Sequence, residues 1–585
     1  MIKGFQLKKS KFLVAGLLVS ALVACSKQEP VEEVAAESSE TEQILKIELP
    51  TPAGPHQIGV VDFELVDNGR EESFKPGTPR RIPVRAWFPA SSVSGAPKLY
   101  ANDLEMEHIF RASNTAIPQT EAAIAARENL PTHSYEKAVP LAEGARPTVI
   151  FSHGGAGYLS SNTALMEHLA SYGYLVLSIT HPYFSVATFH ENGDIVPLDQ
   201  GLLAGMMADI SDPDFRYMDA YVSPDVAVRL EQTLRNNEEF TIAPQFKIWQ
   251  KDFVHVIDRL ESGDLPENAQ KLLPLVDMNR IGTFGMSFGA SGSAAAHQDN
   301  RIKAAVNLDG GVFDSALVDM DVGIPVLVFH FDPPLGGISA YHSEFVYETL
   351  AMMGTNPDII RLETKGATHM AYTDHVLLPP DVRATAPDGY ASLGTIDGQR
   401  MTDIVNQFVR RFFDKRLSGE GSGLDAQFRA QYPEVVDVDV SHVRDFVASD
   451  AVPRFMSYTH VFQMNRRLAV DEASKAEAEK LDRKYVMAYE LTDSPNGKTE
   501  WWLLNFDPEQ GVYFELKAPE STPDLTMTGD YKAYMRFMKK VVAGEVSAEE
   551  QPVIYSGDQG ILATVGAAFA AANKAASIKT DIPEY

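Results

Sequence analysis

Cysteine is almost absent from this chain of 585 residues, in which Cys25 stands alone. One cysteine cannot form a disulfide within the chain, and it cannot supply the several thiolates of a structural zinc site. The folded part after residue 25 has no cysteine nucleophile. Any covalent catalysis there must use another side chain.

A hydrophobic run long enough to span a membrane is missing from the N-terminal region. Its apolar run, Phe12–Ala24, has 13 residues, whereas a membrane-spanning helix needs about 20. A basic start and a short apolar core are typical of a secretory signal peptide. The run ends in Leu-Val-Ala-Cys at 22–25, which resembles a bacterial lipobox. We therefore expect a signal peptide at 1–24, lipidation at Cys25 and a lipoprotein of the cell envelope, facing the periplasm or in the outer membrane. The alternative is a cytosolic protein with an apolar N-terminal helix.

Positive charge is scarce, because 51 Lys and Arg stand against 80 Asp and Glu, a formal net charge of −29. Such a surface repels nucleic acid and anionic headgroups. The sequence therefore argues against a nucleic-acid partner, and it predicts that acyl chains at Cys25 provide any membrane attachment. No His-Glu-x-x-His pattern occurs, and we predict neither a metal nor a cofactor.

The chain is long enough for at least two domains. Residues 25–45 are acidic and lack aromatics, which predicts a flexible tether. We expect a first domain at 46–416, with an inserted lid at about 195–245 that has a helix around 222–234. A Gly- and Ser-rich stretch then opens a linker at 417–445, and a second domain covers 446–585.

Buried strands and helices alternate in the first domain, which predicts an α/β fold with a mostly parallel sheet covered on both faces. An Asn-Gly turn at 191–194 predicts a hairpin before the lid. The second domain has an α+β pattern. Strands are expected in the first domain at 80–89, 147–152, 174–179, 281–284, 304–308, 325–331 and, as the last strand, 359–363; helices at 163–172, 248–260 and 404–413; strands in the second at 484–491, 500–506 and 511–516, with a helix at 531–542.

Gly-Met-Ser-Phe-Gly at 285–289 matches Gly-x-Ser-x-Gly, the nucleophile elbow in which a strand turns sharply into a helix. A predicted strand precedes it and small residues follow it, so we expect Ser287 to be a nucleophile. The alternative is a purely structural turn.

A glycine-rich loop, His-Gly-Gly-Ala-Gly at 153–157, follows an upstream buried strand. Acyl transfer builds negative charge on the carbonyl oxygen, which backbone N–H groups can stabilise. The elbow pattern takes one N–H from such a loop and one from the residue after the nucleophile. We assign this oxyanion hole to Gly155 and Phe288; an ordinary flexible loop is the alternative.

A serine nucleophile needs a base and an acid that orients it, in the chain order serine, acid, histidine. His369 follows the expected last strand, and its rivals are His330, inside a strand, and His375, on the next helix. For the acid, spacing leaves Asp309 and Asp332 nearly even, because each follows a predicted strand.

These residues together resemble the plasma and intracellular type II platelet-activating factor acetylhydrolases, and in part the dienelactone-hydrolase-like group. The resemblance covers roughly residues 55–415. It implies an α/β-hydrolase fold, a calcium-independent esterase acting on lipid-like esters, and Asp309 as the acid. The sequence departs from the family pattern in three places. It has Met286 where the family often has His, it has Gly155-Ala156 in the oxyanion loop, and its lid is its own. The shared motifs are Arg81–Pro89, Phe151–Gly154, Gly285–Gly289, Asn307–Asp309 and His369–Asp374.

The tail at about 450–578 is similar to the sterol carrier protein type 2 family, a resemblance carried by 523–528, 531–545 and 555–558. It implies a lipid-binding tunnel that Trp501, Trp502, Tyr513 and Phe514 could line. Aromatic strands are equally typical of an ordinary core.

We thus expect a tethered, serine-dependent carboxylic ester hydrolase acting on hydrophobic esters, with a lipid-binding domain. The alternatives are a polyester or cyclic-ester hydrolase, and a lipid-binding lipoprotein whose hydrolase domain is inactive.

Overall fold

The computed structural model describes residues 46–584, with gaps at 112–119, 143, 337, 339–340, 387–388, 450, 496 and 548–549. The expected signal peptide, Cys25 and the tether lie outside these residues. The chain divides into two compact units: unit 1 is Met1–Asp212 with Phe240–Arg444, and unit 2 is Pro213–Glu239 with Asp445–Tyr585. Among the helices described, none combines the length and apolarity of a membrane span.

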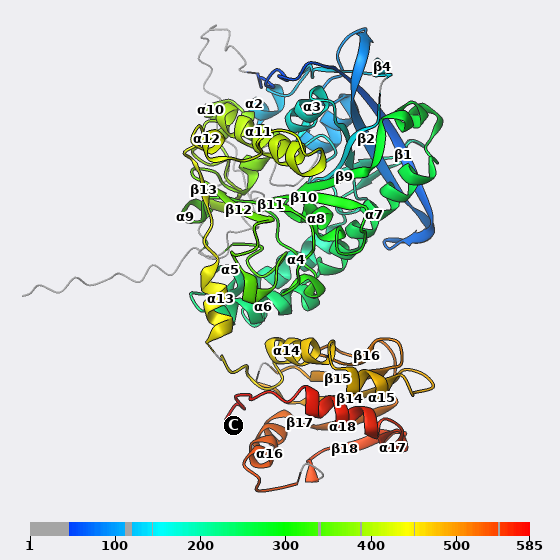
Figure 1. The fold of residues 1–585 in the computed structure, drawn as a ribbon, viewed down its shortest axis with the longest axis vertical. Coiled ribbons are helices and arrows are strands. Elements are labelled where there is room, and N and C mark those ends of the chain that lie inside the picture. The colour runs from blue at the N-terminus through cyan, green and yellow to red at the C-terminus, as the bar shows by residue number, and fades with distance from the viewer. Residues whose placement is uncertain are drawn as a thin grey trace, which may run out of the picture. The chain divides into compact units, whose positions relative to one another are not determined.

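Unit 1 is built on a sheet that has eleven strands within the described residues (Figure 1). Its central strands β5, β6, β9, β10, β11 and β12 are parallel, and β2 joins them antiparallel to β6. The order is β13 (Val435–Asp437), β12 (Ile359–Thr364), β11 (Val326–His330), β10 (Ile302–Leu308), β9 (Val276–Met286), β5 (Arg146–Ser152), β6 (Leu175–Ile179), β2 (Lys75–Ser94), β1 (Gln57–Glu72) and β3 (Ser134–Tyr135), with β4 (Lys137–Pro140) beside β2.

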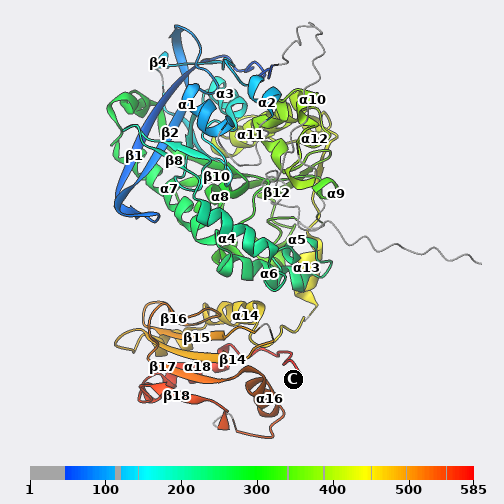
Figure 2. The same ribbon diagram turned by 180° about the vertical axis from the view of Figure 1, so that it is seen from behind.

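Helices cover both faces of this sheet, as Figure 2 shows. On β9, Ile281 shares a core cluster with Phe253 and Ile257 of α7. A Cβ on its neighbour Gly282 would instead lie 2.9 Å from the ring of Phe413 in α11. Alternate residues of a strand face opposite sides, so the apolar strands are buried twice, and the expected α/β fold is confirmed. The main helices are α3 (Thr163–Ser171), α7 (Ala243–Ser262), α8 (Ser291–Ala295) and α11 (Gly398–Leu417), with short α1 (Asp103–Glu105), α2 (Glu121–Ala125), α9 (Pro333–Gly336) and α10 (Pro380–Arg383).

The expected linker at 417–445 is structured. It contains α12 (Ala426–Arg429) and β13, and α13 (Ser441–Ala448) begins in it. Strand β13 pairs antiparallel with β12, so 359–363 is not the last strand of the sheet. An edge strand of three residues is too short to show a hydrophobic period, which is why the pattern misses it.

The predicted hairpin before the lid is present as β7 (Ala187–Phe189) and β8 (Ile195–Pro197). Three helices follow it: α4 (Gln200–Ser211), α5 (Asp219–Val222) and α6 (Val226–Glu239). The helix expected around 222–234 begins only at Val226, because Pro224 disfavours helical backbone at the residue before it. The two units divide the lid, since 213–239 belongs to unit 2.

Unit 2 contains a five-stranded sheet within the described residues, with α+β character as expected (Figure 1). Its core includes Trp502, Phe506 and Phe514 from the sheet and Tyr534 and Met535 from α16. The strand order is β16 (Gly511–Glu515), β15 (Glu500–Asp507), β14 (Tyr485–Thr492), β17 (Leu525–Asp530) and β18 (Ile554–Gly557), and the helices are α14 (Tyr458–Leu468), α15 (Glu472–Ala478), α16 (Tyr531–Val542), α17 (Ile561–Thr564) and α18 (Gly566–Ala575).

A buried ion cluster joins β2 to α7 in unit 1. The Arg80 guanidinium donates to Asp252 at 2.6 Å and to Glu72 at 2.7 Å. Its side chain is 2% exposed and that of Asp252 is 0% exposed. Burial opposes ionisation of Asp252, but Arg80 and the hydrogen bond from His181 outweigh it and hold the pKa of Asp252 well below its usual range. Each charge in this cluster therefore depends on its partner.

We predict that Arg80→Met destabilises the protein by about 3–5 kcal/mol, because it leaves buried Glu72 without its cation and buried Asp252 with Arg70 as its remaining arginine. Urea unfolding followed by circular dichroism measures the change. Arg416→Met is the matched control: this arginine pairs at 2.8 Å with a half-exposed Asp358, and exposed pairs contribute about 1 kcal/mol or less. Equal losses in the two variants would contradict the prediction.

Candidate active site

Ser287 lies at the turn between β9 and the short helix Ser287–Ala290, where the elbow motif predicts it. Its backbone φ is +56°, a left-handed conformation that is uncommon for a residue with a side chain. Its neighbours Met286 and Phe288 are buried, whereas Ser287 is half-buried. The strained turn therefore leaves the hydroxyl-bearing residue as the more accessible point of the elbow.

The glycines of the elbow are required by close backbone contacts. A Cβ on Gly285 would lie 2.0 Å from the carbonyl oxygen of Gly289, and one on Gly289 would lie 2.1 Å from that of Ser152. Real Cβ atoms do not approach so closely. A third contact involves Gly310, whose added Cβ would lie 2.1 Å from the carbonyl oxygen of Ser287. The elbow is thus wedged between the ends of β5 and β10.

The glycine-rich loop lies against the elbow. A Cβ on Gly154 would lie 2.9 Å from that of Ser287, and one on Gly155 would lie 2.9 Å from the ring of Phe184. Within the loop, the N–H of Ala156 donates to Phe184 and that of Gly157 donates to Gly154, both at 2.9 Å. The loop is therefore packed against the elbow at Gly154 and against Phe184 at Gly155.

His369 and Asp309 meet although 60 residues separate them in the chain. The Nδ1 of His369 lies 2.6 Å from Oδ2 of Asp309, and both side chains are buried. The other oxygen of Asp309 accepts the backbone N–H of Phe331 at 3.2 Å. A carboxylate only accepts hydrogen bonds, so the Nδ1 proton points to Asp309 and Nε2 is the basic nitrogen.

Burial sets the protonation of this pair. It lowers the pKa of His369 to about 3, which keeps the ring neutral near pH 7. It raises the pKa of Asp309, an effect opposed by nearby His342 and by the N–H of Phe331. Because the carboxylate accepts two N–H groups, the shared proton belongs on His369. A neutral histidine oriented by an acid can act as a general base.

The rival residues are used elsewhere. Asp332 accepts the N–H of Gly366 at 3.0 Å and lies 3.6 Å from Lys365, so it braces the turn before His369. His330 is buried at the end of β11 against the ring of Tyr341. His375 contacts buried Arg127 at 2.7 Å. Only His369 among these histidines is paired with an acid from the end of a parallel strand.

Sequence reasoning missed several residues that shape this site. Asn307 uses its side chain to accept the N–H of Gly310 at 2.7 Å and to donate to the Tyr347 hydroxyl, also at 2.7 Å. His342 lies near His369, with ring centroids 6.1 Å apart. The position of Asn307 two residues before Asp309 was a usable signal, whereas nothing local marks Tyr347 or His342.

An aromatic cluster surrounds Phe288. The rings of Phe184 and Trp249 each lie 4.9 Å from that of Phe288, and those of Phe246 and Phe313 lie at 5.3 and 5.6 Å. All of these side chains are buried. They exclude water beside the elbow and leave an apolar environment there.

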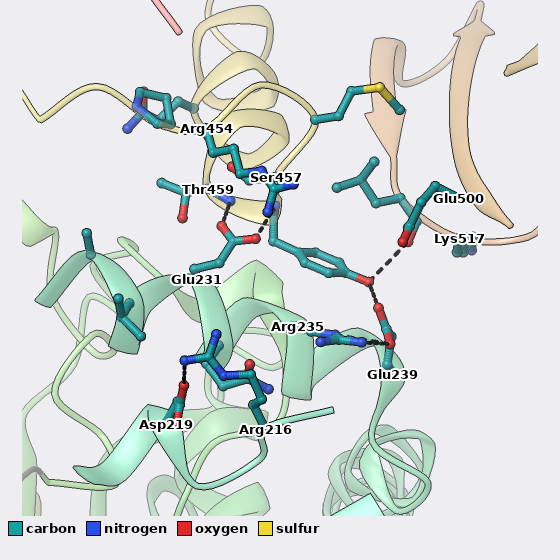
Figure 3. Close-up of a pocket in the computed structure, with 18 of the residues that line it drawn as sticks. Arg216, Asp219, Glu231, Arg235, Glu239, Arg454, Ser457, Thr459, Glu500 and Lys517 are labelled. Atoms are coloured by element: carbon teal, nitrogen blue, oxygen red, sulfur yellow. Dashed lines mark hydrogen bonds and ion pairs between the residues drawn. The ribbon is translucent and has the colours of Figure 1, made fainter. Parts of the chain in front are cut away.

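Unit 2 contains a separate pocket of about 740 Å³, shown in Figure 3. Charged residues dominate its labelled lining, where Arg235 pairs with Glu239 and Glu231 accepts N–H groups at the start of α14. Of the four aromatics expected in a lipid tunnel, Trp501 lines this pocket, whereas Trp502 and Phe514 belong to the packed core. No group of three or more acidic, His or Cys side chains able to hold a metal occurs in the described residues.

Several known proteins are similar to this chain. Residues 45–420 match the sequence model of the family "Platelet-activating factor acetylhydrolase, isoform II". The chain is 24% identical over 464 residues to a probable 1-alkyl-2-acetylglycerophosphocholine esterase of Arthroderma benhamiae, a match covering 73% of this chain and all of that protein. A ferulic acid esterase structure from Streptomyces cinnamoneus is also similar, at 24% identity and a TM-score of 0.45, covering 67% of this chain and 99% of that one.

The matched region contains β1 to β12, the elbow, the glycine-rich loop and the Asp309–His369 pair, and it spans more than half of the chain. The resemblance inferred from the motifs is therefore confirmed: the chain belongs to the platelet-activating factor acetylhydrolase isoform II family of esterases.

Proposed function

We propose that this chain is a serine-dependent carboxylic ester hydrolase that acts on lipid-like esters. The observation that supports it most is the convergence on one sheet edge of a strained serine, Ser287, with the buried His369–Asp309 pair. Ser287, Asp309 and His369 follow three parallel strands, β9, β10 and β12, whose carboxyl ends share that edge. The substrate class rests on the family and on the apolar surroundings of Phe288.

The proposed reaction proceeds in two stages. His369 takes the proton of Ser287 as the serine oxygen attacks the ester carbonyl, and Asp309 stabilises the protonated ring. The N–H groups of Gly155 and Phe288 hold the oxyanion. The carbon–oxygen bond of the ester breaks, and the leaving alcohol receives the proton from His369. Water then attacks the acyl-enzyme by the same route, which releases the acid and restores Ser287.

A fluorophosphonate probe tests this assignment. We predict that the wild-type protein is labelled, that Ser287→Ala is not, and that Asp309→Asn is labelled slower by about 10³–10⁴-fold, because the amide cannot orient His369 as the carboxylate does. Asp332→Asn is the matched control and should label within about threefold of wild type, because the amide oxygen of asparagine can still accept the N–H of Gly366.

Absence of labelling in a folded wild-type protein would contradict the proposal and favour a lipid-binding protein with an inactive hydrolase unit. If only Asp332→Asn were labelled slowly, Asp332 rather than Asp309 would be the acid that orients His369. A panel of short-chain, polymeric and cyclic esters then separates a lipid esterase from a polyester or cyclic-ester hydrolase.

The pH dependence of kcat/KM follows from the burial of His369. The base must be neutral, and burial lowers its pKa below the ordinary 6.5. Burial also raises the pKa of Asp309, so the acid limb of the activity belongs to the His369–Asp309 pair. Because the carboxylate is held by two N–H groups, we expect the pair to take up its proton below pH 6.5 and activity to fall only there. An acid limb with its midpoint at or above 6.5, measured with an uncharged soluble ester, would contradict this.

We further propose that lipidation at Cys25 anchors the protein in the bacterial cell envelope and that unit 2 is a sterol-carrier-like domain that captures a hydrophobic ester or its released acid. The lipobox-like residues 22–25 and the tail motifs support these proposals. The pocket of unit 2 places Trp501 among charged side chains of both signs, a lining that suits an amphipathic ligand.

We predict that Trp501→Ala raises KM for long-chain esters about three- to tenfold, since loss of an aromatic contact costs about 1 kcal/mol or more. KM for short soluble esters should not change. Tyr513→Ala is the matched control, because Tyr513 lies on the neighbouring strand outside the pocket lining. Equal changes for long and short esters would contradict a role of unit 2 in capture.

A further inference from the structure

A second chain of serine, histidine and aspartate lies within unit 1, and the proposed reaction does not use it. We propose that Ser152, His181 and Asp252 form a buried positioning unit that holds the oxyanion loop and the elbow in register. This inference rests on the proposed function, because it concerns the hydrogen-bond donors of that same site.

The three side chains are linked end to end. The Ser152 hydroxyl lies 2.9 Å from Nε2 of His181, and Nδ1 of His181 lies 2.7 Å from Oδ2 of Asp252. Ser152 ends β5, His181 follows β6, and Asp252 lies in α7. Three elements that are distant in sequence are therefore tied together directly beneath the glycine-rich loop, which begins at the next residue, His153.

The order of protons along this chain is fixed. Burial lowers the pKa of His181 to about 4, against the opposing effect of Asp252, so the ring is neutral at pH 7. The carboxylate of Asp252 only accepts, so the ring proton sits on Nδ1. Nε2 is then an acceptor. The Ser152 oxygen lies 2.9 Å from Nε2 and 3.2 Å from the carbonyl oxygen of His153, and the shorter contact assigns the hydroxyl proton to Nε2. The polarity is the same as in a Ser-His-Asp triad.

The Ser152–His181–Asp252 chain differs from the proposed catalytic residues in its exposure to solvent. Ser152, His181 and Asp252 are each 0% exposed, so a substrate carbonyl cannot reach the Ser152 hydroxyl. Asp252 is also bound by Arg80 and Arg70, which fixes it from the far side. These three side chains are enclosed and hydrogen-bonded to one another. Their role is therefore to position the residues that contact them.

Those neighbours are the two proposed oxyanion donors. A Cβ on Gly289 would lie 2.1 Å from the carbonyl oxygen of Ser152. The backbone of Ser152 therefore packs directly against the elbow. His181 stacks on Trp249 at 3.8 Å between ring centroids, and Trp249 packs edge-on against Phe288 at 4.9 Å. A shift of His181 therefore moves the residue whose N–H holds the oxyanion.

The glycine-rich loop is fixed from the same side. Nδ1 of His153 donates to the carbonyl of Gly154 at 2.7 Å, and its Nε2 accepts from the Thr180 hydroxyl at 3.0 Å. The Ser185 hydroxyl oxygen lies 2.9 Å from the same nitrogen and donates to the carbonyl of His181 at 2.8 Å. In a trans peptide the C=O and the following N–H point in opposite directions. Holding the carbonyl of Gly154 thus directs the N–H of Gly155 away from His153.

Ser152→Ala and His181→Phe test the proposal in the full-length protein. The first removes one hydroxyl, and the second keeps a ring on Trp249 but removes both nitrogens. We expect kcat to fall about tenfold or more in each, with KM for a soluble ester unchanged within twofold. Displacement of an oxyanion donor affects the transition state more than substrate binding. The inhibition constant of a trifluoromethyl ketone should rise by the same factor as kcat falls.

Two comparisons separate positioning from general structural loss. Ser171→Ala removes an equally buried hydroxyl, which donates to His168 at 2.7 Å in α3 away from the elbow, and should leave kcat unchanged. The double variant Ser152→Ala/His181→Phe should lose no more kcat than His181→Phe alone, because the residues act as one unit.

Wild-type kcat in Ser152→Ala, or losses that multiply in the double variant, would overturn the inference. Ser152→Ala decides the question if His181→Phe does not fold. Ser287→Ala identifies a failure of the proposed function itself: if that variant hydrolyses the ester as fast as wild type, the serine mechanism is wrong, whatever the effect at Ser152.

Discussion

The site depends on one steric constraint, the contact between the nucleophile elbow and the end of β5. The chain turns from β9 into a helix within four residues, and the turn fits only because Gly285 and Gly289 carry no side chain. Ser287 takes the strain as a positive φ. Such strain persists only where the surroundings over-determine the backbone, and here β5 on one side and Gly310 on the other provide that support.

Burial has a second consequence, because it makes every charge near the elbow conditional on a partner. Asp309 keeps its place by accepting two N–H groups, and Asp252 keeps its charge through Arg80 and Arg70. The same burial lowers the pKa of His369 and of His181. The apolar environment therefore keeps both histidines neutral near pH 7, as the proposed base requires of His369.

The elements of the site that local sequence determines could be predicted. The elbow around Ser287 and the loop around Gly155 follow from glycines next to apolar strands, and the fold class follows from those strands. The choice between Asp309 and Asp332 could not be settled from spacing, because both follow a strand and only their side-chain directions differ. The edge strand β13 and the link from Ser152 to Asp252 gave no signal, since the first is three residues long and the second joins residues 100 positions apart.

The proposed triad and the Ser152–His181–Asp252 chain together show that residue types and distances alone do not define a nucleophile. Both have a histidine bonded to a buried aspartate within 2.7 Å. Ser287 lies in a left-handed turn and is half-buried, whereas Ser152 ends an extended strand with no exposed surface. Reactivity requires that the hydroxyl meet a carbonyl and that N–H groups face the developing charge. Backbone conformation and exposure, which the glycines control, therefore favour Ser287 over Ser152 as the proposed nucleophile.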